Sequence, residues 1–171
     1  LAELVKPNKV QPNTREMVDI AGLVKGASKG EGLGNQFLGN IRATSAIIHV
    51  LRCFDDGNVI HVDGSVDPIR DKEIIDTELQ LKDLDTVVKR IQKVEKMAKT
   101  DKDAKRTFDI LTIIKAHLET GSSVRSASLE KDDFEFIKEM GLLTQKPVMY
   151  VCNVDEGSVI DGNAYTQKVI E

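Results

Sequence analysis

The 171-residue sequence contains no tryptophan, only seven phenylalanines and tyrosines, and two cysteines. So few aromatic side chains argue against an aromatic-lined binding groove, and no apolar run approaches the roughly 20 residues that a membrane-spanning helix needs. Two cysteines, Cys53 and Cys152, are too few for a disulfide framework, and we expect free thiols in a reducing compartment. The first residues do not form a basic segment followed by an apolar one, so we expect no secretory signal and a cytoplasmic location.

Hydrophobic residues make up 40% of the chain and charged residues 30%, which is enough for a buried core. The net charge is −4, but the charges are unevenly distributed. Between Lys82 and Arg106, nine Lys or Arg residues stand against five Asp or Glu residues. Such a run is typical of a solvated helix face, and it is also typical of an arm that contacts nucleic-acid phosphates.

Three short apolar runs rich in β-branched residues predict strands, at residues 17–21, 46–51 and 147–152. Near-continuous apolar strands indicate a parallel sheet that is covered on both faces. A glycine-rich stretch and a helical pattern, with Phe37 and Ile41 on one face, separate the first two runs. The sequence therefore predicts an α/β fold.

The region between the second and third strands is helical in pattern. Apolar residues in residues 69–98 follow a heptad spacing, with Ile74, Leu81 and Val88 in one row and Leu84, Ile91 and Ala98 in the next. A second stripe consists of Ala104, Phe108, Leu111, Ile114 and Leu118, and the polar residues 99–103 separate the two stripes. This pattern predicts an antiparallel helical hairpin that buries its seam like a coiled coil. We expect a further helix with Ser128 as its N-cap and Glu130 in its first turn.

The segment that follows the first predicted strand carries the clearest chemical signal. Asp19 ends that strand, and Gly22 is the first of five glycines within thirteen residues. A carboxylate at a strand end can hold a water bound to Mg²⁺, and a glycine three residues later lets a backbone N–H approach a γ-phosphate. The alternatives are a strand-end turn and a surface loop without a ligand.

A second candidate site follows the third predicted strand, at residues 153–156. Ligands of open parallel sheets bind outside the carboxyl ends of the strands, so Asp19 and Asn153 could contact one molecule. An asparagine amide can both donate to and accept from a base edge. Taken alone, the pattern is equally typical of a turn.

Together these segments resemble the YchF/Obg-like ATPase subfamily of Obg-like P-loop NTPases. The resemblance covers nearly the whole chain and rests on residues 19–38, 49–54, 66–68, 78–79, 83–85 and 153–156. The Asn-x-x-Glu at residues 153–156 replaces the Asn-Lys-x-Asp with which GTPases read guanine. This replacement and the helical hairpin separate the subfamily from Obg GTPases proper.

The resemblance implies an α/β fold with part of a P-loop NTPase G domain, a parallel sheet with flanking helices and an inserted antiparallel helical hairpin. Residues 1–65, with the second switch, and residues 144–171, with the base-recognition motif, would form the G-domain parts. Residues 66–143 would form the helical coiled-coil insertion.

The resemblance also implies functional residues. Asp19, through a water, and Gly22 would serve Mg²⁺ and the γ-phosphate, and Asn153, Val154 and Glu156 would line a base pocket. The switch would include Lys25, Gly26, Gly30, Gly32 and Gly34. Leu23 stands where many GTPases have the glutamine that orients water, so no catalytic base can be named.

The implied activity is binding and hydrolysis of ATP, with weaker use of GTP, in the presence of Mg²⁺. Glu156 would hold its carboxylate one methylene too far for the paired contact to guanine, which removes the preference for GTP. The implied partner is the ribosome or its RNA, contacted by basic residues of the hairpin, namely Lys89, Arg90, Lys93, Lys96, Lys99, Lys102, Lys105 and Arg106.

The chain departs from the family pattern in one respect, because no Gly-x-x-x-x-Gly-Lys-Ser/Thr phosphate loop is present. We therefore expect an interior fragment that lacks the phosphate loop and a C-terminal TGS domain, and that binds nucleotide very weakly by itself. Two other readings stay open, namely an Obg-type GTPase and a non-catalytic interaction module that uses the hairpin.

Overall fold

A computed structural model describes residue 9 and residues 14–20, 33–59 and 64–171 of the chain. Its α-helices are α2 (Leu33–Ala43), α3 (Pro68–Val94), α4 (Lys102–Glu119), α5 (Asp133–Ile137) and α6 (Ala164–Ile170). The strands are β1 (Ile47–Arg52) and β2 (Val148–Asn153). Four 3₁₀ turns lie at Met97–Lys99, Val124–Ser126, Lys138–Met140 and Glu156–Ser158. None of the described helices is both long enough and apolar enough to cross a membrane.

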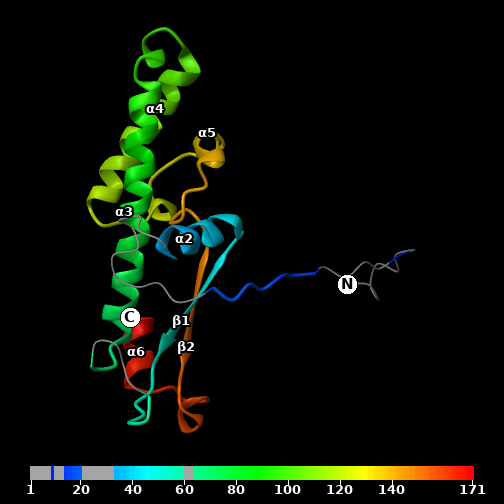
Figure 1. The fold of residues 1–171 in the computed structure, drawn as a ribbon, viewed down its shortest axis with the longest axis vertical. Coiled ribbons are helices and arrows are strands. Elements are labelled where there is room, and N and C mark those ends of the chain that lie inside the picture. The colour runs from blue at the N-terminus through cyan, green and yellow to red at the C-terminus, as the bar shows by residue number, and fades with distance from the viewer. Residues whose placement is uncertain (1–8, 10–13, 21–32, 60–63) are drawn as a thin grey trace.

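The two strands form a parallel pair whose register runs from Ile47 opposite Val148 to Arg52 opposite Asn153. Although 95 residues separate β1 and β2, they lie side by side (Figure 1). The predicted strands at 46–51 and 147–152 are therefore confirmed with a shift of one residue. The α/β class and the parallel pairing are confirmed with them.

Only one face of this sheet is covered by the described residues. Side chains that alternate along both strands are exposed on the other face, namely Ile48, Val50, Met149 and Val151. The expectation of a sheet covered on both faces is wrong for the described structure. Short apolar runs do not reveal by themselves how many layers pack on them, because both faces of each run are apolar.

The strand expected at residues 17–21 is not formed within residues 17–20, and Ala21 lies outside the described residues. Met17 is 79% exposed and Val18 is 58% exposed, so this run is not a buried strand. A strand needs a neighbour for its backbone hydrogen bonds, and among the described residues β1 and β2 pair only with each other. Ile20 instead packs on a small core formed by α2, α3 and Leu143.

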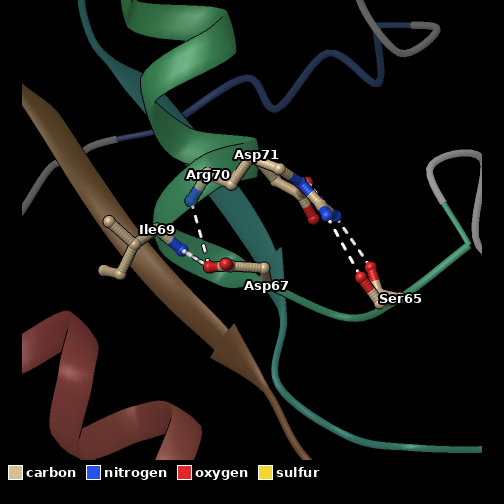
Figure 2. Close-up of polar contacts among 5 residues, drawn as sticks. All are labelled: Ser65, Asp67, Ile69, Arg70 and Asp71. Carbon is tan, nitrogen blue, oxygen red and sulfur yellow. Dashed lines mark hydrogen bonds and ion pairs between the residues drawn. The ribbon is translucent and has the colours of Figure 1, made fainter.

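Helix α3 begins at a well-defined cap. Asp67 accepts hydrogen bonds from the backbone N–H groups of Ile69 and Arg70, both at 3.2 Å, and Pro68 occupies the first turn (Figure 2). These hydrogen bonds, that of Arg70 first, lower the pKa of the Asp67 carboxyl. The guanidinium of Arg70 donates to Ser65 and so fixes the segment that enters the helix. Asp and Pro at these positions are typical of a helix start.

Helices α3 and α4 pack against each other and are joined by the short turn at Met97–Lys99 (Figure 1). Their shared core contains Val87, Val94, Ile110, Leu111, Ile114 and Leu118, with Leu84, Ile91 and Phe108 packed against it. Leu84 and Ile91 of one predicted row are thus confirmed, and so are Phe108, Leu111, Ile114 and Leu118 of the α4 stripe. Ala98 and Ala104 do not belong to this core, and Ile110, which was not predicted, does. The row through Leu81 is not confirmed, since Leu81 is 49% exposed and Val87 and Val94 take its place. That this helix pair is an insertion in a G domain stays a prediction.

The segment after α4 also differs from expectation. Ser128 caps no described helix. Helix α5 begins five residues later, at Asp133, and is only five residues long. Asp133 is buried, accepts a hydrogen bond from the backbone of Glu130 and forms an ion pair with Arg106 of α4. The carboxylate is thus used to fix α5 on α4, and the helix starts where that contact is made.

Asp83 joins α3 to the chain that enters β2. Its carboxylate is fully buried and accepts hydrogen bonds from Leu143 N at 2.8 Å, Thr144 N at 2.7 Å and Thr144 Oγ1 at 2.7 Å. A buried carboxylate needs such partners, because an unpaired one would be very costly to desolvate. The contact fixes the position of β2 relative to the long helix.

Candidate functional site

The carboxyl ends of both strands form one edge of the sheet. The strands end at Arg52 and Asn153, and Cys53 N donates to Asn153 O at 2.7 Å, which continues the pairing by one residue. Beyond β2, Val154 is half-buried and Glu156 is exposed in the turn Glu156–Ser158. The three predicted base-pocket residues therefore lie at the edge where parallel sheets bind their ligands.

Asp155 gives the loop after β2 a fixed shape. Its carboxylate accepts hydrogen bonds from Ser158 N at 3.1 Å and from Ser158 Oγ at 2.9 Å. This is the local turn that an Asn-Asp loop favours, and it holds the backbone on both sides of Glu156. The side chain of Glu156 remains exposed and available to a ligand.

Further side chains reach the same edge from regions that sequence reasoning did not single out. Asn163 Nδ2 donates to Cys53 O at 2.7 Å, and Tyr165 Oη donates to Asp55 Oδ2 at 2.7 Å. The hydrogen bond to Asp55 raises the pKa of the Tyr165 hydroxyl. Asn163 also caps α6 by accepting from the N–H groups of Tyr165 and Thr166. The cap was a readable signal in the sequence, but its contact with Cys53 depends on the path of the loop.

Arg52 closes the edge on the β1 side. Its guanidinium lies 4.7 Å from the centroid of the Phe54 ring and donates to Val59 O at 2.9 Å. The side chain thereby fixes the loop that follows β1. The loop after β1, the loop after β2 and the start of α6 together form a polar edge rich in hydrogen-bond donors and acceptors.

The glycine-rich segment lies largely outside the described residues, and with it Gly22, Leu23, Lys25, Gly26, Gly30 and Gly32. Gly34 lies in α2. Asp19 is exposed and does not end a strand, so the expected strand-end position is wrong. The convergence of Asp19 and Asn153 on one nucleotide stays a prediction.

The described residues contain no group of three His, Cys, Asp or Glu side chains that could hold a metal ion. Asp19 alone could contribute one ligand position, through a water. Mg²⁺ is usually bound in this way, by one or two carboxylates together with waters and the phosphates of a nucleotide. Asp19 would be the contribution of the described residues to such a site, and Mg²⁺ binding itself stays a prediction.

The covered face of the sheet carries a polar cluster near the amino ends of the strands. Tyr150 Oη donates to Asp76 Oδ2 at 3.3 Å, and Lys72 Nζ lies 2.8 Å from the same oxygen. The ring of His49 lies 5.6 Å from that of Tyr150. Burial lowers the pKa of His49 and raises that of Tyr150, so both are neutral groups at neutral pH.

The two thiols lie beside the edge and are free. Cys53 is buried, and burial together with the neighbouring Cys152 raises the pKa of its thiol to about 12. A thiol with so high a pKa carries almost no thiolate at neutral pH, which argues against a nucleophilic role. Both cysteines are free, as expected from the sequence, and Cys152 is half-buried.

The eight basic residues predicted to contact RNA are divided by the structure into two sets. Lys89 pairs with Asp85 at 2.7 Å, Lys105 pairs with Asp109, and Arg106 pairs with Asp133. The other five have no ion pair with any described residue, namely Arg90, Lys93, Lys96, Lys99 and Lys102. Several of the predicted cations are thus available to a polyanion.

A shallow groove of about 400 Å³ lies along the exposed side of α3. Five cationic side chains line it, namely Arg42, Lys82, Lys89, Arg90 and Lys93. The other side chains of the lining are Asp85, Thr86 and Met140. Lys82 begins the basic run seen in the sequence, whereas Arg42 was not predicted as a member of this surface. Arg42 comes from α2, forty residues away from Lys82, so no local pattern joins them.

Comparison with known proteins gives close relatives over the whole chain. It is 52% identical over 170 residues to the ribosome-binding ATPase YchF of Haemophilus ducreyi, covering 99% of this chain and 47% of that protein. It is 51% identical to the protein of the same name from Escherichia coli O157:H7, and 47% identical over 158 residues to the Obg-like ATPase 1 of Oryza sativa subsp. indica. No family model matches the chain.

A solved structure agrees with these relatives. The YchF GTPase of Schizosaccharomyces pombe superposes with a TM-score of 0.78 and 39% sequence identity, over 99% of this chain and 47% of that one. The chain spans about half the length of the relatives it matches. The resemblance to the YchF/Obg-like ATPase subfamily is thereby confirmed.

Proposed function

We propose that this chain, as a member of the YchF and Obg-like ATPase family, contributes nucleotide-contacting segments to an ATP-hydrolysing protein. The similarity to that family extends over nearly the whole chain. The observation that carries this proposal is the 52% identity over 170 residues to a ribosome-binding ATPase. The position of residues 153–156 at the carboxyl edge of a parallel pair supports it, because this is where such sheets bind ligands.

In this proposal Asn153, Val154 and Glu156 contact the base. The amide of Asn153 can donate to a ring nitrogen of adenine and accept from its exocyclic amine. Val154 gives an apolar surface for the base, and Glu156 is the reason that guanine gains no preference. ATP is therefore the preferred nucleotide and GTP the weaker one.

Asp19 and Gly22 are proposed to serve the triphosphate end. Mg²⁺ bound with the nucleotide would supply electrostatic stabilisation of the charge that develops on the transferred phosphoryl group. Asp19 would hold a water of that ion, and the backbone N–H of Gly22 would donate to the γ-phosphate. Lys25, Gly26, Gly30 and Gly32, together with Gly34 in the first turn of α2, would form the switch segment.

The proposed partner is the ribosome, contacted through RNA by the basic residues of α3, α4 and their connecting turn. Five of the eight predicted residues have no ion pair with a described residue, so their charges are free to meet phosphates. A ribosomal partner would place the protein in the cytoplasm.

The proposal is tested with a chimaera in which this chain replaces the matching segment of the Escherichia coli O157:H7 relative. We expect the chimaera to hydrolyse ATP in preference to GTP. Asn153→Ala in the chimaera should raise KM for ATP about tenfold, because it removes hydrogen bonds to the base worth about 1.4 kcal/mol. Gln167→Ala, on the exposed side of α6, is the matched control and should leave KM unchanged.

Each other result contradicts a defined part of the proposal. A chimaera that prefers GTP would identify an Obg-type GTPase instead. A chimaera with native circular dichroism that binds neither nucleotide would identify an interaction module. If Glu156→Asp brings no gain in GTP affinity, the explanation given for the nucleotide preference is wrong.

A further inference from the structure

The groove along α3 brings positive charge from two helices to one place. It brings together Arg42 from α2 and four cations from α3, with Asp85 as the only acidic side chain in its lining. Lys89 already pairs with Asp85. Lys82, Arg90 and Lys93 form no ion pair and no side-chain hydrogen bond with any residue that the structure describes. Arg42 also interacts electrostatically with the buried carboxylate of Asp83, and the five cations and one carboxylate of the lining leave the groove with a net charge of +4.

Arg42 is held in place at the edge of this groove. Its Nε donates to Gly141 O at 3.3 Å, and its side chain lies directly over Gly141, where a Cβ would come within 3.0 Å of Arg42 Cγ. Gly141 has φ of 57°, which glycine adopts without strain. Lys146 Nζ donates to Arg42 O and so fixes the end of α2 as well. Among the described residues, the other N–H groups of the guanidinium have no hydrogen-bond acceptor.

The cations of α3 form a line along one side of the helix. Lys82, Lys89 and Lys93 are seven and four residues apart, which places them within a narrow stripe of an α-helix. At a rise of about 1.5 Å per residue they are spaced about 10 Å and about 6 Å apart along the axis. These spacings exceed the ~3.4 Å between successive phosphates along a strand of duplex DNA, so one nucleic-acid strand can bring a phosphate to each of these cations.

The lining favours a polyphosphate over a protein segment. Met140 is the only large apolar side chain in it, so the groove has no pocket for an aromatic or aliphatic anchor. Stable protein interfaces depend on such buried anchors, whereas binding to a nucleic-acid backbone depends mainly on charge. An acidic peptide would find charge but nothing to hold its side chains.

We propose that the groove between the end of α2 and the middle of α3 binds the phosphate backbone of RNA, with Arg42, Lys82, Arg90 and Lys93 as the contacts. This deepens the proposed function, on which it rests, because it locates the RNA contact at the groove and not at the turn between α3 and α4. Lys89 contributes charge but shares it with Asp85.

The test compares two pairs of charge reversals that change the net charge equally. The groove variant is Arg42→Glu with Lys82→Glu, and the turn variant is Lys99→Glu with Lys102→Glu. Binding of a fluorescein-labelled single-stranded RNA is followed by fluorescence anisotropy at low salt. We expect the groove variant to weaken binding at least about tenfold and the turn variant to have a clearly smaller effect.

Lys131→Glu with Lys168→Glu, two exposed residues outside the groove, is the remote control and should leave the affinity unchanged. Far-ultraviolet circular dichroism verifies that each variant keeps its helices. Unlabelled RNA should displace the probe more effectively than polyglutamate does at equal charge.

The outcomes separate this inference from the proposed function. Loss of binding in the turn variant alone overturns the groove but leaves RNA binding by the helix pair intact. Equal binding by all variants overturns both. Displacement by polyglutamate as effective as displacement by RNA overturns the assignment of RNA in favour of an acidic protein partner.

Discussion

The buried carboxylate of Asp83 is the residue on which the attachment of β2 to α3 depends. Burial raises the pKa of this carboxyl, and the hydrogen bonds from Thr144 and Leu143 act in the opposite direction. Three donors therefore rely on one side chain, namely the N–H groups of Leu143 and Thr144 and the hydroxyl of Thr144. Removing the carboxylate would leave all three without their partner in a buried position.

We expect Asp83→Ala to lower the free energy of unfolding by about 3 kcal/mol or more, since each unsatisfied buried donor costs about 1–3 kcal/mol. Urea denaturation followed by circular dichroism measures this value. Asp85→Ala is the control, because Asp85 is exposed and loses only an ion pair with Lys89. Equal effects of the two substitutions would show that Asp83 is not a structural clamp.

His49 makes stability depend on pH. Burial lowers its pKa, Asp76 raises it and Lys72 lowers it further, with a net decrease. The unfolded chain then binds a proton more readily than the folded one, so the stability contribution of neutral His49 is present above about pH 6.5 and is lost as the pH falls below it.

His49→Phe removes this titration but keeps a ring beside Tyr150. When the pH is lowered from 7.5 to 5.5, the free energy of unfolding should fall more in the native protein than in the His49→Phe variant. Denaturation curves at several pH values measure the difference. Parallel pH profiles for the two proteins would mean that His49 titrates normally in the folded state.

The position of a candidate site residue could be predicted where that residue directly follows a strand. Asn153 was identified because the apolar run before it predicts a strand end, and strand ends of parallel sheets form binding edges. Asn163 and Tyr165 reach the same edge by contacts across 110 residues, with Cys53 and Asp55 respectively. No periodicity encodes such a contact, so the sequence alone could not indicate it.

At the scale of elements, the apolar period predicts that a helix is amphipathic but does not define the row that faces the partner. In α3 the heptad spacing gave two adjacent rows, and only the row of Leu84 and Ile91 packs in the shared core. Leu81, in the other row, is largely exposed because the core is centred on Val87 and Val94 instead. Which row is buried depends on the position of α4, which is a tertiary property.

The same limit explains the missing strand at residues 17–20. Its composition is as apolar and β-branched as that of β2, yet the described structure offers it no pairing partner. Strand formation requires hydrogen bonds from a neighbour, whereas a helix satisfies its own backbone. This is why α2 and α4 were predicted well and one of three strands was not.

The seam between α3 and α4 can be tested with two neighbouring isoleucines. Ile114 is fully buried in the seam and Ile113 is 49% exposed. We expect Ile114→Ala to lower the free energy of unfolding by about 3 kcal/mol, because it leaves a cavity in a packed core. Ile113→Ala should cost less than about 1 kcal/mol, and urea denaturation measures both. A larger cost for Ile113→Ala would mean that α4 faces α3 with another side.

At the scale of the whole molecule, charge is separated in space. The chain carries a net charge of −4, but the groove beside α2 and α3 is strongly positive. A polyanion should therefore be attracted more strongly to this groove than to a surface that carried the average charge of the chain. Such a distribution makes binding orientation-specific without any sequence-specific contact. It also makes the affinity sensitive to salt, since each phosphate that is contacted releases counterions.

The salt dependence of RNA binding gives the number of phosphates that the protein contacts. For single-stranded RNA, the logarithm of the binding constant should fall linearly with the logarithm of the salt concentration, with a slope of about −0.7 per phosphate contacted. Neutralising Arg42 and Lys82 together, as Arg42→Gln with Lys82→Gln, removes two cations of the groove and should make the slope less steep by about 1.4. Anisotropy titrations at several salt concentrations measure it, with Lys168→Gln as a control that keeps the native slope. If the double variant and the native protein give parallel lines, these two side chains do not contact phosphates, and the groove is not where the RNA lies.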